Sequence, residues 1–174
     1  MSVKDWWPGP IIPKRSVSRR RDGTVIERWK YKGRLHREDG PAHIKTYPDG
    51  SRSEAWYIDG HPHRKDGPAV IDNRPDGLRY EGWFIDGRLH REDSPAAIET
   101  QPDGEHIEEW WIDGHLHRED GPAVIETRPD GLHSEELYID GHLHREDGPA
   151  VIITSPGGYR REEWWIHGQQ VEAP

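Results

Sequence analysis

Residues 114–131 read Gly-His-Leu-His-Arg-Glu-Asp-Gly-Pro-Ala-Val-Ile-Glu-Thr-Arg-Pro-Asp-Gly, and this stretch returns along most of the chain. Its first glycine recurs every 27 residues without an insertion, at Gly33, Gly60, Gly87, Gly114, Gly141 and Gly168. Five full copies therefore occupy residues 33–167. A half copy precedes them, because Gly23 aligns with Gly50 and Trp29 aligns with Trp56. A constant period of this kind is typical of repeat proteins, in which each unit packs against its neighbours.

Each copy predicts a β-hairpin. In the first full copy, residues 41–46 and 54–58 are strand-like segments on either side of Tyr-Pro-Asp-Gly at residues 47–50. Proline sets the backbone of the second turn position, and glycine accepts the positive φ that ends the turn. We therefore expect a type I turn with a glycine bulge. This turn places Ile44 opposite Glu54 and Ala42 opposite Trp56.

The recurring positions also predict two unlike faces, because successive side chains of a strand point to opposite sides. One face carries an isoleucine column and a tryptophan column, namely Ile44, Ile71, Ile98, Ile125 and Ile152, and Trp56, Trp83, Trp110, Leu137 and Trp164. Ile58 and its equivalents belong to the same face. The opposite face carries an aromatic column with acidic neighbours: Tyr57, Phe84, Trp111, Tyr138 and Trp165, with Glu109, Glu136 and Glu163.

The fold class that follows is all-β, an elongated antiparallel meander of stacked β-hairpin repeats with about eleven strands. Among 174 residues there are 19 glycines and 15 prolines, which interrupt any helical reading. Only 31% of the residues are hydrophobic and 33% are charged, so a thick two-layer core would be hard to fill.

The nine-residue connections between hairpins, such as residues 59–67, are longer than a tight turn requires. We expect them to fold over the Trp/Ile face and to bury Leu35, Leu89, Leu116 and Leu143. Position 40 is glycine in four copies and serine (Ser94) in the third, so its backbone must suit a residue that has a Cβ atom.

The His-Arg-Glu-Asp run in these connections resembles a catalytic cluster, yet a catalytic site is normally unique within a chain. Its recurrence favours a structural role instead. We expect the arginines to pair with a glutamate column, that is Arg37, Arg64, Arg91, Arg118 and Arg145 with Glu54, Glu81, Glu108, Glu135 and Glu162. Asp39 and its equivalents would cap nearby backbone N–H groups.

Metal and cofactor chemistry is not predicted. The His-x-His pairs are His61/His63, His115/His117 and His142/His144. Equivalent positions of successive hairpins lie about 10 Å apart, too far for one metal ion to join them. There is no cysteine, and we find no phosphate-binding glycine loop or nucleophile motif. The sequence therefore predicts a protein that is not an enzyme and that carries no metal or cofactor.

The charge is unevenly distributed. Residues 1–32 carry a net charge of +6 and the remainder carries −15. We divide the chain into a basic, Trp/Pro-rich N-terminal cap or arm (residues 1–22), the hairpin repeats (residues 23–168) and a short tail (residues 169–174). The acidic repeats are not expected to bind nucleic acid, because they repel phosphate. No apolar run is long enough to span a membrane, so we expect no membrane association and a cytoplasmic location.

The pattern resembles MORN-type repeat proteins, in particular divergent variants with "LHREDGPA" repeats found in phage, giant-virus and bacterial hypothetical proteins. The resembling residues are the Trp-Trp-Ile-Asp-Gly run at 110–114 and the hairpin-plus-loop organisation over residues 23–168. The period is longer than the usual unit of that family, and its Tyr-x-Gly-rich core motif is absent. The resemblance implies stacked hairpins and a scaffolding or binding role.

The sequence thus predicts non-catalytic binding of a protein partner with a basic surface. The expected binding residues are the aromatic column (Tyr57, Phe84, Trp111, Tyr138 and Trp165) with Glu109, Glu136 and Glu163. Two alternatives stay open: an acidic inhibitor, phage-encoded, that imitates a nucleic acid and acts on a host protein, and a carbohydrate-binding protein that uses the aromatic row. The last strand, residues 162–166, could also form a homodimer through an exposed edge.

Overall fold

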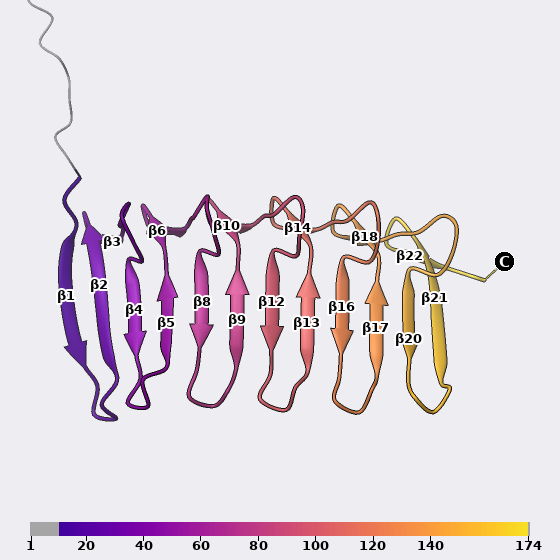
Figure 1. The fold of residues 1–174 in the computed structure, drawn as a ribbon. Helices are drawn as coiled ribbons and strands as arrows, with labels where there is room; N and C mark the ends of the chain where they lie inside the picture. Colours follow the sequence, from indigo (N-terminus) through magenta and orange to yellow (C-terminus); the bar gives the residue numbers. More distant parts are fainter. Residues whose placement is uncertain (1–10, 174) are drawn as a thin grey trace, which may run out of the picture.

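The structure, a computed structural model, describes residues 11–173, which form one long antiparallel sheet with its strands in chain order (Figure 1). The order is β1-β2-β4-β5-β8-β9-β12-β13-β16-β17-β20-β21-β22, with β3 paired to β2. The all-β, elongated meander predicted from the repeats is therefore confirmed. Within these residues, no helix is long and apolar enough to cross a membrane.

The main sheet contains fourteen strands. They are β1 (Lys14–Arg19), β2 (Val25–Tyr31), β3 (Arg34–Leu35), β4 (His43–Thr46), β5 (Arg52–Ala55), β8 (Val70–Asn73), β9 (Arg79–Gly82), β12 (Ala97–Thr100), β13 (His106–Glu109), β16 (Val124–Thr127), β17 (His133–Glu136), β20 (Val151–Thr154), β21 (Arg160–Ile166) and β22 (Gln169–Val171). The expected number, about eleven, was too low, because the sequence did not predict β1, β3 and β22.

The long hairpins have the expected turn and register. Tyr47 N donates to Ser51 O over 2.9 Å, Gly50 N donates to Tyr47 O over 3.0 Å, and Gly50 has a φ of 90°. Ile44 lies opposite Glu54, as predicted. However, β5 ends at Ala55. The Trp56 N–H bonds to the next copy, at Ala69 O (2.8 Å), and so the expected second strand, residues 54–58, is divided in two.

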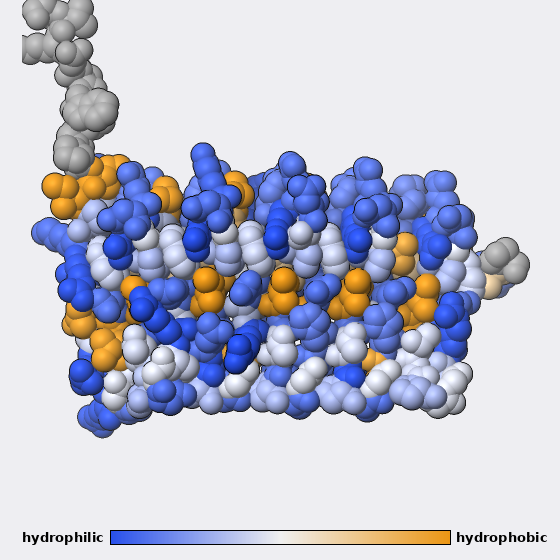
Figure 2. Space-filling view, viewed as in Figure 1, coloured by the Kyte–Doolittle hydropathy of each residue, from blue (hydrophilic) through white to orange (hydrophobic). Residues whose placement is uncertain are grey.

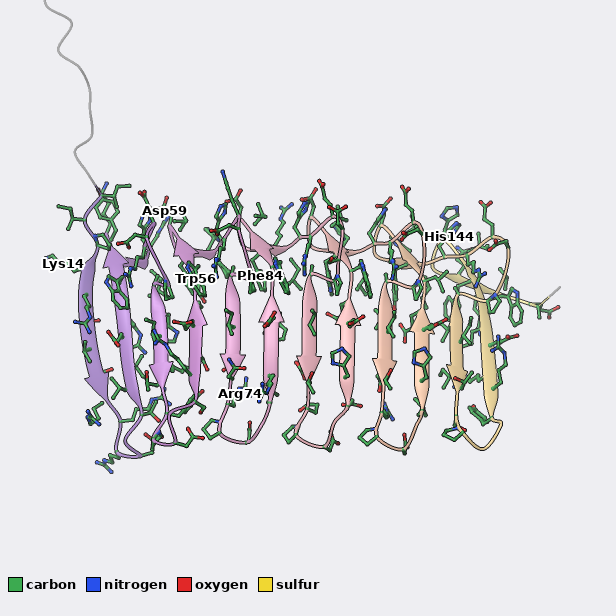
Figure 3. All side chains as sticks on the ribbon, viewed as in Figure 1. Lys14, Trp56, Asp59, Arg74, Phe84 and His144 are labelled. Atoms are coloured by element: carbon green, nitrogen blue, oxygen red, sulfur yellow. The ribbon has the colours of Figure 1, made fainter. Side chains whose placement is uncertain are left out.

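The second half of that segment forms a short hairpin that the sequence analysis missed. β6 (Tyr57–Ile58) pairs with β7 (His61–Pro62) across Asp59 and Gly60, whose φ angles of 50° and 89° define a type I′ turn. Equivalent hairpins are β10 (Phe84–Ile85) with β11 (Arg88–Leu89), β14 (Trp111–Ile112) with β15 (His115–Leu116), and β18 (Tyr138–Ile139) with β19 (His142–Leu143). Figure 3 shows Asp59 in this row of short hairpins and Arg74 at the opposite edge of the sheet.

Neighbouring short hairpins are joined by backbone hydrogen bonds. Gly60 N donates to Leu35 O over 2.8 Å and Arg37 N donates to Tyr57 O over 3.0 Å, and the same pair of bonds recurs in the later copies. The leucines expected to be buried under the connections (Leu35, Leu89, Leu116, Leu143) lie in this row and are only partly buried. The expected burial of these leucines is therefore only partial, whereas the connections do lie over the tryptophans of the Trp/Ile face.

The most buried side chains form a column of alanines between the main sheet and the short hairpins. Ala42, Ala69, Ala96, Ala123 and Ala150 are all 0% exposed. Each alanine lies directly before the first strand of a long hairpin and uses both of its backbone groups: Ala42 N donates to Ala55 O (2.9 Å), and Trp29 N donates to Ala42 O (2.8 Å). On the face of the molecule that Figure 2 shows, apolar side chains appear as separate spots on a hydrophilic surface.

The ends of the sheet are open. β1 has a partner on one side only, and all six of its residues are exposed. Trp6, Trp7, Pro8 and Pro10 of the expected cap lie outside the described residues, and Ile11 and Ile12 are 42% and 74% exposed. At the other end, β22 pairs with Trp164–Ile166, and the Arg160–Glu163 part of β21 pairs with β20 only. Edge-to-edge homodimerisation stays a prediction.

Candidate functional site

The aromatic column predicted to bind a partner lies where the chain passes from the main sheet into the short hairpins. Trp111 begins β14 two residues after Glu109 ends β13, so both side chains lie on the same side of the sheet. Trp111 Nε1 donates to Glu109 Oε2 over 2.9 Å. The same link joins Tyr138 Oη to Glu136 Oε2 (3.0 Å) and Trp165 Nε1 to Glu163 Oε2 (3.1 Å). The structure therefore brings the predicted aromatic and acidic residues together in the last three copies.

The first two copies differ, because Ala55 and Gly82 occupy the position of the glutamate. A Cβ atom on Gly82 would lie 2.6 Å from Phe84 Cε2 and 2.7 Å from Tyr80 Oη. Glycine is needed here for space, because both rings lie against it. The aromatic column continues through these copies as Tyr57 and Phe84, both partly buried, but without a carboxylate beside it.

We call this side of the sheet the aromatic face. Its charge changes along the sheet, as the strand pairing shows. Toward the N-terminal end, Arg28 lies opposite His43, and Lys45 lies opposite Ile26 and Ser53. From β12 onward the same face carries Glu99, Glu109, Glu126, Glu136 and Glu163. Arg161 lies among them but pairs with Glu163 (2.5 Å). The acidic half of the aromatic face is thus suited to cationic groups.

Two tyrosines of the aromatic face, Tyr80 and Tyr138, have raised pKa values. Burial, with the nearby Glu109 and Glu99, raises the pKa of Tyr80 to about 12. Burial, with Glu136 beside the hydroxyl, raises the pKa of Tyr138 to about 12. Tyr80 also lines a small hollow of about 80 Å³ with Ala97, Glu99, Ile107 and Glu109.

These pKa values predict an alkaline transition. Because the fold favours the neutral phenols, their contribution to stability is complete below pH 10 and is lost as the pH rises through about 12. We expect the ultraviolet absorbance of tyrosinate to rise with a component near pH 12, which Tyr80→Phe and Tyr138→Phe each reduce. A single rise centred near pH 10 in the folded protein would contradict this prediction.

The opposite side of the sheet, which we call the loop face, carries the His-Arg-Glu-Asp loops. In four of the five loops, the arginine stacks on the tryptophan eight residues before it. The guanidinium carbon lies 4.3 Å from the ring centre for Arg37 on Trp29, 4.1 Å for Arg64 on Trp56, 4.0 Å for Arg91 on Trp83 and 4.2 Å for Arg118 on Trp110. These are cation–π contacts. Among residues 11–173, no arginine of this column forms an ion pair with the glutamate column, so that expectation is wrong.

The glutamates and aspartates find other partners. The glutamates pair along their own strands, as in Arg52–Glu54 (2.7 Å) and His133–Glu135 (3.3 Å). Asp39 does not cap a backbone group. It accepts a hydrogen bond from Arg37 Nε over 2.8 Å, and this guanidinium holds the pKa of the Asp39 carboxyl below its usual value. Asp66, Asp120 and Asp147 accept the same bond from their arginines.

The third loop shows how position 40 is constrained. Gly40 does not have a positive φ, so the prediction that this backbone suits a side chain is correct. Even so, a Cβ atom on Gly40 would lie 3.0 Å from the guanidinium carbon of Arg37. In the third copy, which has Ser94 here, Arg91 donates to Pro95 O (3.1 Å) without an ion pair to Asp93. Glycine therefore makes room for the arginine that turns back toward its own loop.

The histidines of the loops connect each copy to the next. His36 Nδ1 lies 3.1 Å from both the backbone nitrogen and Oδ1 of Asp59, the first residue of the type I′ turn. The contact recurs as His63–Asp86, His90–Asp113 and His117–Asp140. In the fifth copy, His144 Nδ1 accepts from His167 N (3.2 Å), and the two rings stack. Within residues 11–173, no group of three histidine, aspartate or glutamate side chains is placed to hold a metal ion.

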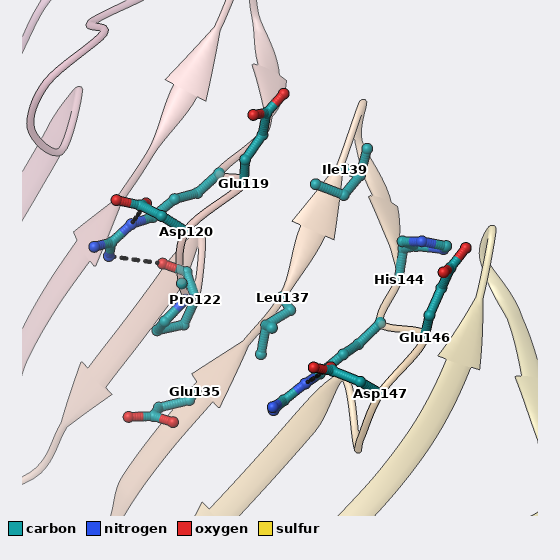
Figure 4. Close-up of a pocket in the computed structure, with 12 residues that line it drawn as sticks. Glu119, Asp120, Pro122, Glu135, Leu137, Ile139, His144, Glu146 and Asp147 are labelled. Carbon is teal, nitrogen blue, oxygen red and sulfur yellow. Dashed lines mark hydrogen bonds and ion pairs between the residues drawn. The ribbon is translucent and has the colours of Figure 1, made fainter.

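The loops leave open hollows between them on the loop face. The first hollow, about 650 Å³, lies between Arg37–Pro41 and His63–Asp66, with Trp56 and Ile58 in its lining. The next, about 690 Å³, has Trp83 and Ile85 in the same places. A third, about 610 Å³, lies between the fourth and fifth loops and has Leu137 and Ile139 there (Figure 4). These hollows were not predicted from the sequence, because their walls come from two different copies.

The chain was compared with protein-family models and with curated proteins, and neither comparison gave a match.

Proposed function

We propose that this protein is a non-catalytic scaffold, MORN-like in its repeats, that binds the basic surface of a protein partner through the acidic half of its aromatic face. The observation that carries the proposal is the row of three aromatic–carboxylate pairs, Trp111–Glu109, Tyr138–Glu136 and Trp165–Glu163. Equivalent pairs are two strands apart, about 10 Å, on a sheet whose backbone is fully paired there. A rigid row of this kind needs little ordering when a partner binds.

The chemistry of each pair suits a lysine or arginine of the partner. In Glu109 and Glu136, Oε2 accepts the hydrogen bond from the neighbouring aromatic side chain. The other carboxylate oxygen of each, Oε1, has no hydrogen-bond partner within residues 11–173. A partner cation can therefore approach Oε1 and lie over the neighbouring ring at the same time. Because the acidic side chains are partly exposed, each contact contributes modestly, and affinity depends on several of them acting together.

The test is a triple variant, Glu109→Gln, Glu136→Gln and Glu163→Gln. Glutamine keeps an oxygen for the aromatic donor and removes the charge. We expect the variant to bind a lysine-rich peptide about tenfold more weakly at low salt, since three exposed charge pairs contribute about 1–2 kcal/mol together. Isothermal titration calorimetry measures the change.

The matched control carries Glu54→Gln, Glu81→Gln and Glu108→Gln, which removes three charges from the loop face. The proposal requires this control to bind the peptide nearly as well as the parent chain. Equal weakening in both variants would show that only net charge matters. Competition by duplex DNA for a natural partner would favour the nucleic-acid mimic, and glycan binding that Trp111→Ala abolishes would favour the carbohydrate-binding alternative.

A further inference from the structure

The fourth copy lacks one of the aromatic rings on which the loop arginines stack. In four loops, the arginine lies over a tryptophan at 4.0 to 4.3 Å. In the fifth loop, the equivalent arginine is Arg145, and the residue eight positions earlier is Leu137. The chain thus contains four examples of an indole under an arginine and one place where the arginine is present without the indole.

Arg145 is held in the same way as its equivalents despite the missing ring. Its Nε donates to Asp147 Oδ1 over 2.8 Å, and Nη1 donates to Pro149 O over 3.4 Å. Arg118, which does have an indole, makes the same two bonds, to Asp120 (2.9 Å) and Pro122 (3.2 Å). The guanidinium is therefore positioned by its own loop and does not need the ring. Its side chain is 32% exposed, compared with 25% for Arg118.

The hollow beside Arg145 also differs in its lining. Figure 4 shows Leu137 between the fourth and fifth loops, with Glu135 below it. Glu135 is part of the lining of this hollow, whereas Glu54 and Glu81 are not part of the lining where Trp56 and Trp83 are present. The three volumes are similar, about 610, 650 and 690 Å³, so the difference is chemical rather than one of size.

We propose that this hollow binds an aromatic side chain from a basic segment of a protein partner. The ring would lie against Leu137 and under the Arg145 guanidinium, in the arrangement that the other copies build from their own tryptophans. Asp120 and Asp147 are bonded to arginines, but the carboxylates of Glu119, Glu135 and Glu146 also line the hollow. They disfavour anionic rings, such as nucleotides, and favour a cationic group next to the aromatic one.

This site is separate from the aromatic face, because Leu137 and Glu135 belong to the loop face. The proposal therefore goes beyond the binding function described above and does not depend on it. The two can fail independently: the triple glutamine variant tests the aromatic face, and the experiment below tests the loop face.

Tryptamine, which joins an indole to an ammonium group, is the probe. We expect it to bind the full chain with a dissociation constant on the order of 1 mM, as measured by amide chemical-shift changes around Leu137 and Arg145. Tryptophol, which is neutral, should bind more weakly, and indole-3-acetate, which is anionic, weaker still. A lysine–tryptophan–lysine tripeptide should bind at least as well as tryptamine.

Two opposite substitutions make the test specific. Leu137→Trp restores the ring found in the other copies, and we expect it to weaken tryptamine binding at least tenfold. Trp83→Leu places a leucine eight residues before Arg91, as Leu137 is placed before Arg145. We expect this variant to have a second tryptamine site beside Arg91. Unchanged binding by Leu137→Trp, or shift changes that map away from both loops, would overturn the proposal. Because the expected result for Trp83→Leu is a gain of binding, this variant tests the proposal even if Leu137→Trp fails to fold.

Discussion

Replacing Ala123 with leucine is expected to lower the free energy of unfolding by about 3 kcal/mol, the largest effect of any single change in the sheet. Ala123 is 0% exposed. Its N–H donates to Glu136 O and its carbonyl accepts from Trp110 N, both over 2.8 Å, so the backbone is held by strands on either side. The larger side chain can be accommodated only if one of these ladders opens.

Chemical denaturation followed by circular dichroism measures this effect. The matched control is Thr127→Leu, at the far end of β16, the strand that follows Ala123, where the side chain is exposed. We expect the control to change the free energy of unfolding by less than about 0.5 kcal/mol. Similar losses in the two variants would mean that the alanine column is not the tightly packed centre of the fold.

Removing a stacked tryptophan has the next largest effect. Trp110→Ala should lower the free energy of unfolding by about 2 kcal/mol, because the indole is partly buried and loses both its packing and the Arg118 stack at 4.2 Å. Trp110→Leu should cost less than the alanine change, since leucine occupies the equivalent position in the fourth copy as Leu137.

A double-mutant cycle separates the stack from simple packing. Trp110→Ala and Arg118→Ala, alone and together, should show a coupling energy of about 1 kcal/mol. The comparison pair is Leu137→Ala in the fourth copy with Arg145→Ala in the fifth, where the arginine has no tryptophan at the equivalent position. A coupling energy at this pair equal to that of Trp110 with Arg118 would show that the cation–π contact contributes nothing.

Much of the fold could be predicted from neighbouring residues. The Tyr-Pro-Asp-Gly turn depends on backbone preferences within four residues, and it sets the register that places Ile44 opposite Glu54. The short hairpins could also be predicted: an Asp-Gly dipeptide such as Asp59-Gly60, directly after the β-forming pair Tyr57–Ile58, is a strong signal for a type I′ turn. The signal is lost when the whole nine-residue connection is taken as one loop.

β1 was harder to predict, because its residues carry little local signal. The segment Lys14–Arg19 contains one apolar residue, Val17, which is 55% exposed. It becomes a strand because β2 offers an unpaired edge, and six residues of β1 pair along it. Such pairing is a property of the assembled sheet rather than of the segment.

From the amino-acid order one can read the 27-residue period, the long hairpins, and the pairing of Trp111 with Glu109, because each depends on residues adjacent in the chain or on alternation along a strand. The arrangement of the loop face required coordinates. The His36–Asp59 contact joins residues 23 positions apart, and the hollow beside Arg145 has walls from two copies. Contacts of this kind depend on how one hairpin lies against the next and on which way each side chain turns. Arg37 turned toward Asp39 and Trp29, not toward the glutamates that its charge alone would select, since its own loop supplies a carboxylate and β2 supplies a ring at contact distance.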